Sequence, residues 1–327
     1  MARVVRTDRE LELPGVDSAL RAAGHELVLL PDGISEDELV HASRETDLLL
    51  MCYTPITRRV IESAEKLKGI VKYGVGIDAI DIPAARSRGI PVVNVPEYAE
   101  ETVAEGAFAL LMALAKNLKP MQRAMERDGW IWPQREWLAS DLAGKTVGVV
   151  GLGRIGSRFA RMAGAFRMRV LAFDPHVKNT VSDLRAMLAE CDFVSIHCVL
   201  NAETTHLIGE SELRAMKPTA FLVNVSRGAI VDEAALLRAL QEKRIAGAAL
   251  DVYTQEPLAR NGHPLSALYA MDNVILSPHL TFYTHEAIAR LEADTLERCL
   301  EVLEGRPVTV KSRDPRLRAQ TRGVRFG

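Results

Sequence analysis

Three glycines form the first group of residues whose types and spacing point to chemistry. Gly151, Gly153 and Gly156 make a GxGxxG pattern between the apolar run Thr146–Val150 and an amphipathic helical pattern. In that setting Gly151 permits a tight turn, Gly153 lets a pyrophosphate approach the backbone, and Gly156 lets the helix pack closely on the strand. The pattern predicts a dinucleotide site.

Two further features refine this prediction. The backbone amides of Arg154 and Ile155 lie at the expected N-terminus of the helix, where the helix dipole favours a phosphate. Asp174 ends the next apolar run, where a carboxylate accepts hydrogen bonds from an adenosine ribose and repels a 2′-phosphate. No arginine follows Asp174 directly, and His176 is the nearest basic residue. The residues therefore favour NAD over NADP.

Several other motifs occur in an order that resembles a known family. They are the segments Lys72–Asp78, Asn224–Gly228, Val231–Glu233, Ala249–Tyr253, Glu256–Pro257 and Ser277–His279. Together with the glycine pattern they resemble the D-isomer-specific 2-hydroxyacid dehydrogenases, over nearly the whole chain. The resemblance implies an NAD-dependent oxidoreductase that interconverts a small 2-oxo acid and its D-2-hydroxy acid.

The resemblance assigns the catalytic roles to three residues. Arg227 matches the arginine that holds the substrate carboxylate and polarises the carbonyl, a task that suits its fixed fork of donors. His279 matches the general acid/base, which gives a proton to the carbonyl oxygen and removes it in the reverse reaction. Glu256 matches the acid that orients this imidazole.

The resemblance also implies further contacts with the cofactor and the substrate. Asp251 matches a residue that orients the nicotinamide carboxamide, and the backbone near Val75 and Gly76 resembles the loop that cradles the substrate carboxylate. The other positions that match cofactor contacts are Thr102, His197, Cys198, Thr204, Val225 and Ser226.

Three departures from the common family pattern concern the substrate pocket. Phe282 follows His279 by three positions, as in the branch of the C-terminal-binding-protein corepressors, and either walls the pocket or packs as an ordinary helix-start residue. Tyr98 stands where relatives often have glycine. Met51 stands near a position that is basic in the phosphoglycerate-oxidising members, so the segment Met51-Cys-Tyr53 disfavours a phosphorylated substrate.

Two alternative functions stay open at this point. A formate-oxidising enzyme is disfavoured, because such enzymes pair their histidine with glutamine rather than with an acid such as Glu256. A corepressor-like module that senses NAD(H) with little turnover agrees with Phe282, although the intact set of Arg227, Glu256 and His279 favours an enzyme.

The elements that must position these residues alternate between short apolar runs and helical patterns, which is typical of an α/β protein with parallel sheets. The expected helices include Val16–Ala23, Glu101–Asn117 and Thr284–Leu303. The expected strands are Ala2–Arg6, His25–Leu29, Leu48–Met51, Ile70–Tyr73, Pro91–Asn94, Thr146–Val150, Arg169–Phe173, Phe193–His197, Ala220–Asn224, Gly247–Asp251 and Val274–Ser277.

These elements predict two doubly wound parallel-sheet domains, Rossmann- or flavodoxin-like. We expect a discontinuous substrate domain, residues 1–100 plus 281–327, and an NAD-binding Rossmann domain, residues 101–280. The active site would lie in the cleft between them, at the carboxyl ends of the strands.

Two segments have no clear periodicity. The stretch Asp128–Asp141 holds Trp130, Trp132 and Trp137 and is expected to be an irregular loop. The family resemblance implies a homodimer built mainly on the Glu101–Asn117 helix and its surroundings, in which these tryptophans either pack in the interface or reach the partner's active site. The basic stretch Lys311–Gly327 is expected to be a frayed or partner-draped tail.

The composition agrees with a globular protein and excludes some partners. The 327 residues carry a formal net charge of −2, and 26% of them are charged. This balance gives no reason to expect nucleic acid or an anionic membrane surface as a partner. No apolar run is long enough to span a bilayer, no signal peptide is visible, and no residues have metal-ligand spacing. The 4 cysteines form no CxxC pair, which suggests free thiols and a cytoplasmic protein.

Overall fold

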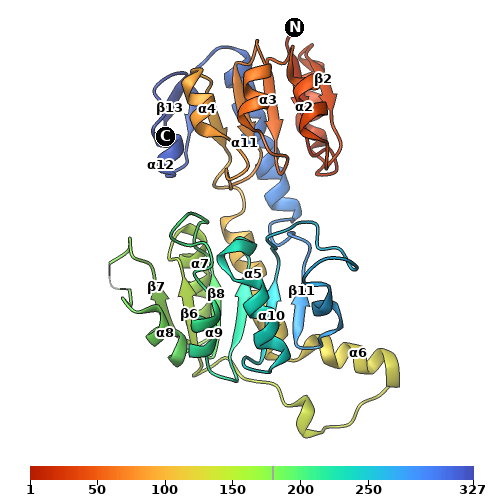
Figure 1. Ribbon diagram of the computed structural model, residues 1–327, viewed down its shortest axis with the longest axis vertical. Helices are drawn as coiled ribbons and strands as arrows, with labels where there is room; N and C mark the ends of the chain where they lie inside the picture. Colours follow the sequence, from red (N-terminus) through yellow and green to blue (C-terminus); the bar gives the residue numbers. More distant parts are fainter. Residues whose placement is uncertain (179) are drawn as a thin grey trace. The chain divides into compact units, whose positions relative to one another are not determined.

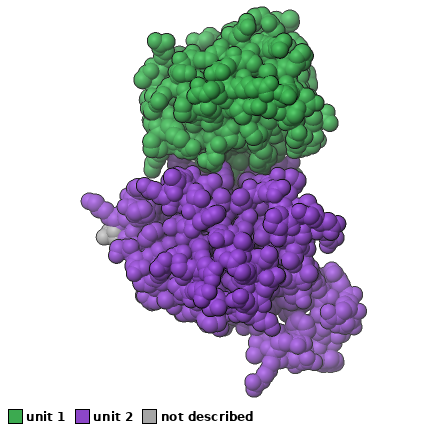
Figure 2. All heavy atoms as spheres, in the orientation of Figure 1, with its two compact units in different colours: residues 1–99, 284–327 green, residues 100–283 purple. Residues whose placement is uncertain are grey.

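A computed structural model describes residues 1–178 and 180–327, and the contacts divide the chain into two compact units. Unit 1 comprises Met1–Ala99 and Thr284–Gly327, and unit 2 comprises Glu100–Tyr283 (Figure 2). Each unit is a parallel sheet with helices on both faces, so the predicted α/β class with two doubly wound sheets is confirmed.

Unit 1 is built on a five-stranded parallel sheet in the order β2-β1-β3-β4-β5, which is the flavodoxin-like order. Every residue of β3 is buried, which is typical of a parallel strand covered on both faces. The strands are β1 (Arg3–Arg6), β2 (Glu26–Leu29), β3 (Leu48–Met51), β4 (Gly69–Lys72) and β5 (Val92–Asn94).

Helices cover both faces of this sheet (Figure 1). Helices α2, α3 and α4 pack along one face, whereas α1 and α11 pack against each other on the opposite face. A capping box between Ser35 and Glu38 begins α2, and the Thr284 side chain caps α11. The helices are α1 (Pro14–Ala22), α2 (Glu36–Ser43), α3 (Arg58–Ser63), α4 (Ile82–Ser87) and α11 (His285–Leu303).

The C-terminal stretch is ordered, so the expected frayed tail is wrong, whereas the alternative of a tail draped over a partner stays a prediction. Strand β12 (Val308–Val310) pairs with β13 (Val324–Phe326), and the short helix α12 (Pro315–Arg318) lies between them. The buried Gln320 side chain accepts a hydrogen bond from the Val92 amide and donates one to the Val92 carbonyl, at 2.7 and 2.8 Å. Contacts with a strand far away in the sequence therefore fix a segment that has no periodicity of its own.

Unit 2 is built on a six-stranded parallel sheet in the order β11-β10-β9-β8-β6-β7. After β6 the chain adds β7 on one side, whereas β8 and the later strands are added on the other side, so a switch point lies between β6 and β8. Ligands of open α/β sheets bind at the carboxyl ends of the strands at such a point. The strands are β6 (Thr146–Val150), β7 (Arg169–Phe173), β8 (Phe193–Ile196), β9 (Phe221–Asn224), β10 (Gly247–Leu250) and β11 (Val274–Leu276).

Helices again form two layers (Figure 1). Helices α5 and α7 pack together on one face, and α8, α9 and α10 follow one another on the other face. The helices are α5 (Glu100–Ala115), α7 (Arg154–Ala165), α8 (Leu184–Glu190), α9 (Glu210–Ala215) and α10 (Glu233–Gln241), with short 3-10 turns at η2 (Gly228–Ile230) and η3 (Ser266–Ala270).

A further helix, α6 (Leu118–Asp128), precedes the tryptophan-rich stretch and was not predicted. Asn117 adopts a left-handed conformation with φ of 52°, which ends the preceding helix and lets α6 start in a new direction. After α6 the chain is irregular, as predicted, except for the 3-10 turn η1 (Arg135–Trp137). In the described part of the chain, no helix has both the length and the apolarity that crossing a membrane requires.

Candidate active site

The glycine-rich turn between β6 and α7 has the geometry that a bound pyrophosphate needs. Gly151 has φ of +91°, and a Cβ there would lie 2.5 Å from the Cys198 amide nitrogen. A Cβ on Gly156 would lie 2.0 Å from the Gly151 carbonyl oxygen. A Cβ on Gly153, by contrast, would meet no atom within 4 Å, so the turn is tight on its inner side and open above Gly153.

The start of α7 and the end of β7 complete this turn. Gly153 occupies the N-cap position of α7 and offers no side chain to the helix amides, which leaves the N-terminus suited to an anion. Asp174 lies beside the turn, where its Oδ2 accepts a hydrogen bond from the Leu152 amide at 2.8 Å. Its Oδ1 accepts from the His176 amide at 2.9 Å, and carboxylate oxygens keep further lone pairs for ribose hydroxyls.

The segment after β8 lies directly under the glycine turn. A Cβ on Gly156 would come within 3.2 Å of the His197 Cβ, and the His197 ring packs on Phe159 with 4.9 Å between ring centroids. His197 Nε2 hydrogen-bonds to Ser195 Oγ at 2.8 Å, while its buried Nδ1 has no partner among the described residues. Burial lowers the pKa of His197 to about 3, so the imidazole is neutral near pH 7.

The other predicted cofactor residues of unit 2 form a connected group with this segment. Ser226 Oγ donates a hydrogen bond to the Cys198 carbonyl at 2.5 Å. Burial raises the pKa of the Cys198 thiol to about 11, so it stays protonated. Thr204 Oγ1 donates to the Val199 carbonyl at 2.6 Å and closes the following turn. Val225 is buried beside Ser226, and Thr102 is buried in α5.

His279 and Glu256 form a hydrogen-bonded pair at the carboxyl ends of β10 and β11. His279 Nδ1 lies 2.8 Å from Glu256 Oε2, and Glu256 Oε1 accepts a hydrogen bond from the Tyr253 amide at 3.0 Å. Burial raises the pKa of Glu256, but the hydrogen bond and charge of His279 outweigh burial and leave this pKa below its usual value. The pair is therefore suited to move a proton at the other ring nitrogen, Nε2.

The backbone around His279 is fixed by a buried carboxylate. His279 has φ of +59°, which is uncommon for a residue other than glycine. Asp251, which is fully buried, accepts hydrogen bonds from the Leu280 amide at 3.0 Å and from the Thr281 amide and hydroxyl at 3.1 and 2.6 Å. In this structure Asp251 holds the chain just after His279; its expected contact with nicotinamide stays a prediction.

Arg227 lies beside the pair, just after the end of β9. Its backbone carbonyl accepts a hydrogen bond from Asn224 Nδ2 at 2.9 Å, and its Nη1 donates to the Ser226 carbonyl at 2.7 Å. A Cβ on Gly228 would lie 2.0 Å from the Tyr253 carbonyl carbon, so only glycine lets this turn approach the loop that holds Glu256. The charge of Arg227 contributes to the lowered pKa of Glu256. Three neighbouring strands thus bring the three predicted catalytic residues together in unit 2.

The predicted substrate residues are divided between the units. Val75, Gly76, Tyr53 and Tyr98 belong to unit 1, where Val75 is exposed and its carbonyl accepts a hydrogen bond from Asn94 Nδ2 at 2.6 Å. Tyr53 is exposed and Tyr98 is buried. Phe282 belongs to unit 2, is buried, and meets the His279 ring edge to face with 6.4 Å between centroids. The expected cleft stays a prediction.

Two residues near the predicted substrate loop were missed by the sequence analysis. Asp8 is buried and accepts hydrogen bonds from the amides of Cys52, Tyr53 and Thr54 at 2.8 to 3.0 Å, so it shapes the loop after β3. Its place two residues after the end of β1 was the available signal, because these amides lie more than forty residues further on.

Lys72, which begins the segment Lys72–Asp78, is the second residue to which the sequence analysis gave no role. It ends β4 and is buried, with Nζ 3.0 Å from Cys52 Sγ and 5.4 Å from the centre of the Tyr53 ring. A Cβ on Gly74 would lie 2.8 Å from this Nζ, so the ammonium lies directly against the turn that leads to Val75. No carboxylate pairs with it among the described residues. A charged residue at the end of a buried strand was the available signal.

Comparison with protein-family models identifies a match to part of the sequence. The family model for the NAD-binding domain of the D-isomer-specific 2-hydroxyacid dehydrogenases matches residues 108–281. A glyoxylate reductase of Korarchaeum cryptofilum is 40% identical over 282 residues, which cover 83% of this chain and 84% of the relative.

A D-3-phosphoglycerate dehydrogenase of Synechocystis is 38% identical over 316 residues, or 94% of this chain. The chain spans only 55% of that relative's length.

Solved structures show the same similarity. The TT0316 protein of Thermus thermophilus has a TM-score of 0.84 at 36% identity, covering 93% of this chain and 97% of that one. A D-lactate dehydrogenase of Aquifex aeolicus, complexed with NAD and lactic acid, has a TM-score of 0.82 at 31% identity and covers 92% and 96% of the two chains.

Proposed function

The chain belongs to the D-isomer-specific 2-hydroxyacid dehydrogenase family, and we propose that it interconverts a small 2-oxo acid and its D-2-hydroxy acid. The family predicted from the sequence is thereby confirmed, and with it an NAD-binding domain in residues 108–281. The observation that carries the proposed reaction is the 2.8 Å hydrogen bond between His279 and Glu256 beside Arg227.

The residues of unit 2 fit NAD. The space above Gly153 accepts a pyrophosphate, the start of α7 offers amides to it, and Asp174 presents a carboxylate beside the same turn. When bound, NAD supplies or accepts the hydride at C2 of the substrate. We propose that unit 2 is the NAD-binding domain and that unit 1 is the substrate domain.

The protein's own residues would handle the proton and the substrate charge. With Nδ1 held by Glu256, His279 donates a proton from Nε2 to the carbonyl oxygen during reduction and removes it from the hydroxyl during oxidation. Arg227 binds the substrate carboxylate with its guanidinium and polarises the adjacent carbonyl. Asp251 keeps the backbone after His279 in place, so that the imidazole does not lose its orientation.

The residues proposed to contact the substrate in unit 1 are the amides near Val75 and Gly76 and the side chains of Tyr53 and Tyr98, and the one in unit 2 is Phe282. Phe282 packs against the His279 ring, which supports a role in walling the pocket. Lys72 adds a positive charge against the Gly74 turn, where it would attract the acid group of the substrate. The favoured substrate is therefore a short 2-oxo acid with a compact, mainly apolar side chain.

We also propose that the protein is a homodimer. The segment from α6 to residue 141 exposes large apolar side chains: Trp130, Trp132 and Leu138 are 69%, 72% and 75% exposed. A monomer rarely exposes such a group, and interfaces are enriched in tryptophan. A second copy of the chain is proposed to cover these side chains, and the tryptophans would then either pack in the interface or reach the partner's active site. The four free cysteines agree with a cytoplasmic location.

The experiment that tests the reaction is NADH oxidation by the purified protein against a panel of acids. The panel contains glyoxylate, hydroxypyruvate, pyruvate, phenylpyruvate and 4-methylthio-2-oxobutanoate. We expect turnover of at least one acid and its loss in His279→Ala, with NADH binding retained. If NADH binds but no acid is reduced, the chain is a sensing module rather than a dehydrogenase.

A further inference from the structure

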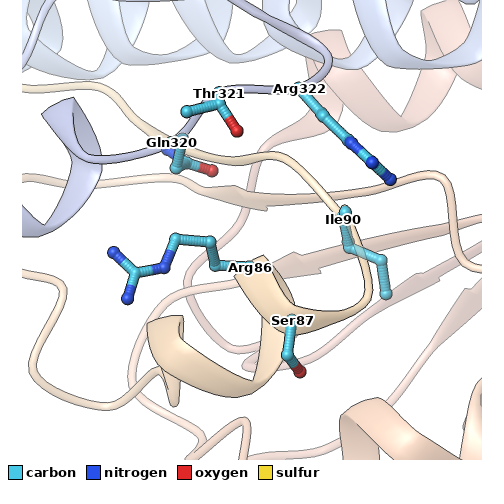
Figure 3. A pocket seen from close by; sticks show the side chains of 7 residues that line it. Arg86, Ser87, Ile90, Gln320, Thr321 and Arg322 are labelled. Carbon is cyan, nitrogen blue, oxygen red and sulfur yellow. The ribbon is translucent and has the colours of Figure 1, made fainter.

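A pocket in unit 1 involves none of the residues assigned above to the cofactor or the substrate. It has a volume of about 280 Å³ and lies where the turn between α4 and β5 meets the C-terminal segment (Figure 3). Its lining residues are Arg86, Ser87, Gly89, Ile90, Gln320, Thr321 and Arg322. This volume lies just below the range of about 300–1,000 Å³ that is usual for ligand sites, so the pocket has room only for a small molecule.

The charge of the lining is one-sided. Two of the lining residues are arginines and none is acidic. Among the described residues, neither Arg86 nor Arg322 has an ion pair or a side-chain hydrogen bond. Neighbouring arginines are occupied: Arg316 pairs with Asp314, and Arg318 donates to the Ser312 carbonyl. The pocket therefore presents two available guanidinium groups, which attract anions.

The wall formed by the C-terminal segment is held in a defined place. The buried Gln320 amide binds both the amide and the carbonyl of Val92, which fixes the following residues against β5. The Arg322 side chain packs against Gly89, since a Cβ on Gly89 would lie 3.4 Å from the Arg322 Cδ. Ile90 is buried in the lining and supplies an apolar surface. These contacts form the pocket before any ligand arrives.

We propose that this pocket binds a small linear molecule with an acidic group at each end. Figure 3 shows the Arg86 and Arg322 side chains extending to opposite sides of the pocket, with Ile90 on the side of Arg322. Each guanidinium has the fork geometry that binds a carboxylate or phosphate through two hydrogen bonds. A short apolar chain between the two acidic groups could contact Ile90, which supplies the apolar part of the lining. The site is independent of the dehydrogenase reaction.

Calorimetric titration of the whole protein tests this proposal, with succinate and glutarate as probes, and acetate and inorganic phosphate for comparison. We expect saturable binding of a dicarboxylate, at least about tenfold weaker binding of acetate, and weakening by salt. Arg86→Gln and Arg322→Gln should each weaken dicarboxylate binding by about tenfold, as expected for a lost charge-assisted hydrogen bond. Arg313→Gln, which removes an exposed arginine of the same segment outside the pocket, should leave binding unchanged.

Two controls keep the outcome clear. Arg227→Gln should retain dicarboxylate binding, which separates this pocket from the proposed active site. NADH binding in every variant shows that the protein is folded. The proposal is overturned if neither dicarboxylate binds saturably or if the Arg86 and Arg322 variants bind as the unchanged protein does. It is also overturned if inorganic phosphate binds as tightly as the dicarboxylates and only one arginine matters.

Discussion

At the scale of single residues, the hydrogen bond that Glu256 Oε2 accepts from His279 Nδ1 is the contact on which the proposed proton transfer depends. Glu256→Gln keeps the shape of the side chain but removes the charge that stabilises the imidazolium. We expect kcat to fall by about 10²-fold with little change in KM, measured with the preferred acid. Glu233→Gln is a matched control, because Glu233 holds the amide of Thr254 in the same loop without touching His279. Equal losses in both variants would contradict the assigned role.

The Glu256 carboxylate also makes the stability of the folded protein depend on pH. Because the pKa of Glu256 lies below its usual value of 4.5, the carboxylate stays ionised throughout the neutral range. Its stabilising effect on the folded protein is present above that usual value and is lost as the pH falls through the lowered pKa.

His197 gives a second pH dependence, with its own window. Its pKa is about 3 in the folded protein against 6.5 for an ordinary histidine, so only the unfolded chain takes up a proton between these values. The folded state therefore loses stability as the pH falls below 6.5, by up to about 1.4 kcal/mol per pH unit from this residue. Urea unfolding at pH 6.5 and 5.5 should show this loss in the unchanged protein and a smaller one in His197→Asn. The exposed His285→Gln is the control, and an unaltered loss in His197→Asn would refute the assignment.

A substitution of Lys72 tests whether the loop that leads to Val75 binds the acid group of the substrate. Lys72→Met keeps the length of the side chain and removes the charge that lies against Gly74. We expect KM for the acid to rise by about tenfold with kcat and NADH affinity nearly unchanged, since a hydrogen bond or contact to a charged group would be lost. Lys68→Met, at an exposed lysine just before β4, is the control. A selective fall in kcat would instead place Lys72 in the proton transfer.

At the scale of elements, the β6–α7 turn separates two roles of glycine. A Cβ on Gly156 meets the Gly151 carbonyl oxygen at 2.0 Å, so Gly156→Ala must move backbone, and we expect it to destabilise unit 2 by about 1–3 kcal/mol. Gly153→Ala meets nothing within 4 Å, so the protein should keep its stability while its NADH affinity falls, because the methyl group occupies the space for the pyrophosphate. Thermal unfolding and NADH fluorescence titration measure the two effects. Unchanged NADH affinity in Gly153→Ala would show that the cofactor lies elsewhere.

The elements also show how far the sequence could predict the fold. All eleven expected strands occur within one or two residues of their predicted ends, because buried parallel strands are continuous apolar runs. The elements β12, α12 and β13 were missed, since each is too short to show a period and depends on distant contacts such as Gln320 with Val92. Helix α6 was missed because a left-handed Asn117, not a proline or glycine, divides it from α5.

The candidate site shows the same limit. Arg227, Glu256 and His279 could be predicted as catalytic candidates because each lies in a motif. The structure places them after the ends of neighbouring strands of one sheet. Asp8 carries no motif of its own, and Lys72 begins the segment Lys72–Asp78 but received no role from it. The importance of both residues depends on which loop of the fold lies beside them. Residues of this second kind become visible only when the tertiary contacts are known.

At the scale of the whole molecule, the exposed apolar group between α6 and residue 141 predicts a second copy of the chain. Trp130 and Trp132 meet edge to face with 6.3 Å between centroids and leave most of their surface uncovered. Burying each of such side chains is worth about 1.5–3 kcal/mol, which favours association. Sedimentation should therefore give a dimer for the unchanged protein and a shift toward monomer for Trp132→Arg or Leu138→Arg.

Activity measurements on the tryptophan variants then distinguish burial in the interface from contact with the partner's substrate. If the tryptophans only bury surface, Trp130→Ala, Trp132→Ala and Trp137→Ala should lose activity in proportion to the loss of dimer. If one of them also reaches the partner's substrate, that variant should stay dimeric while its KM changes with the size of the acid. A chain that sediments as a monomer at all concentrations, with full activity, would remove both roles.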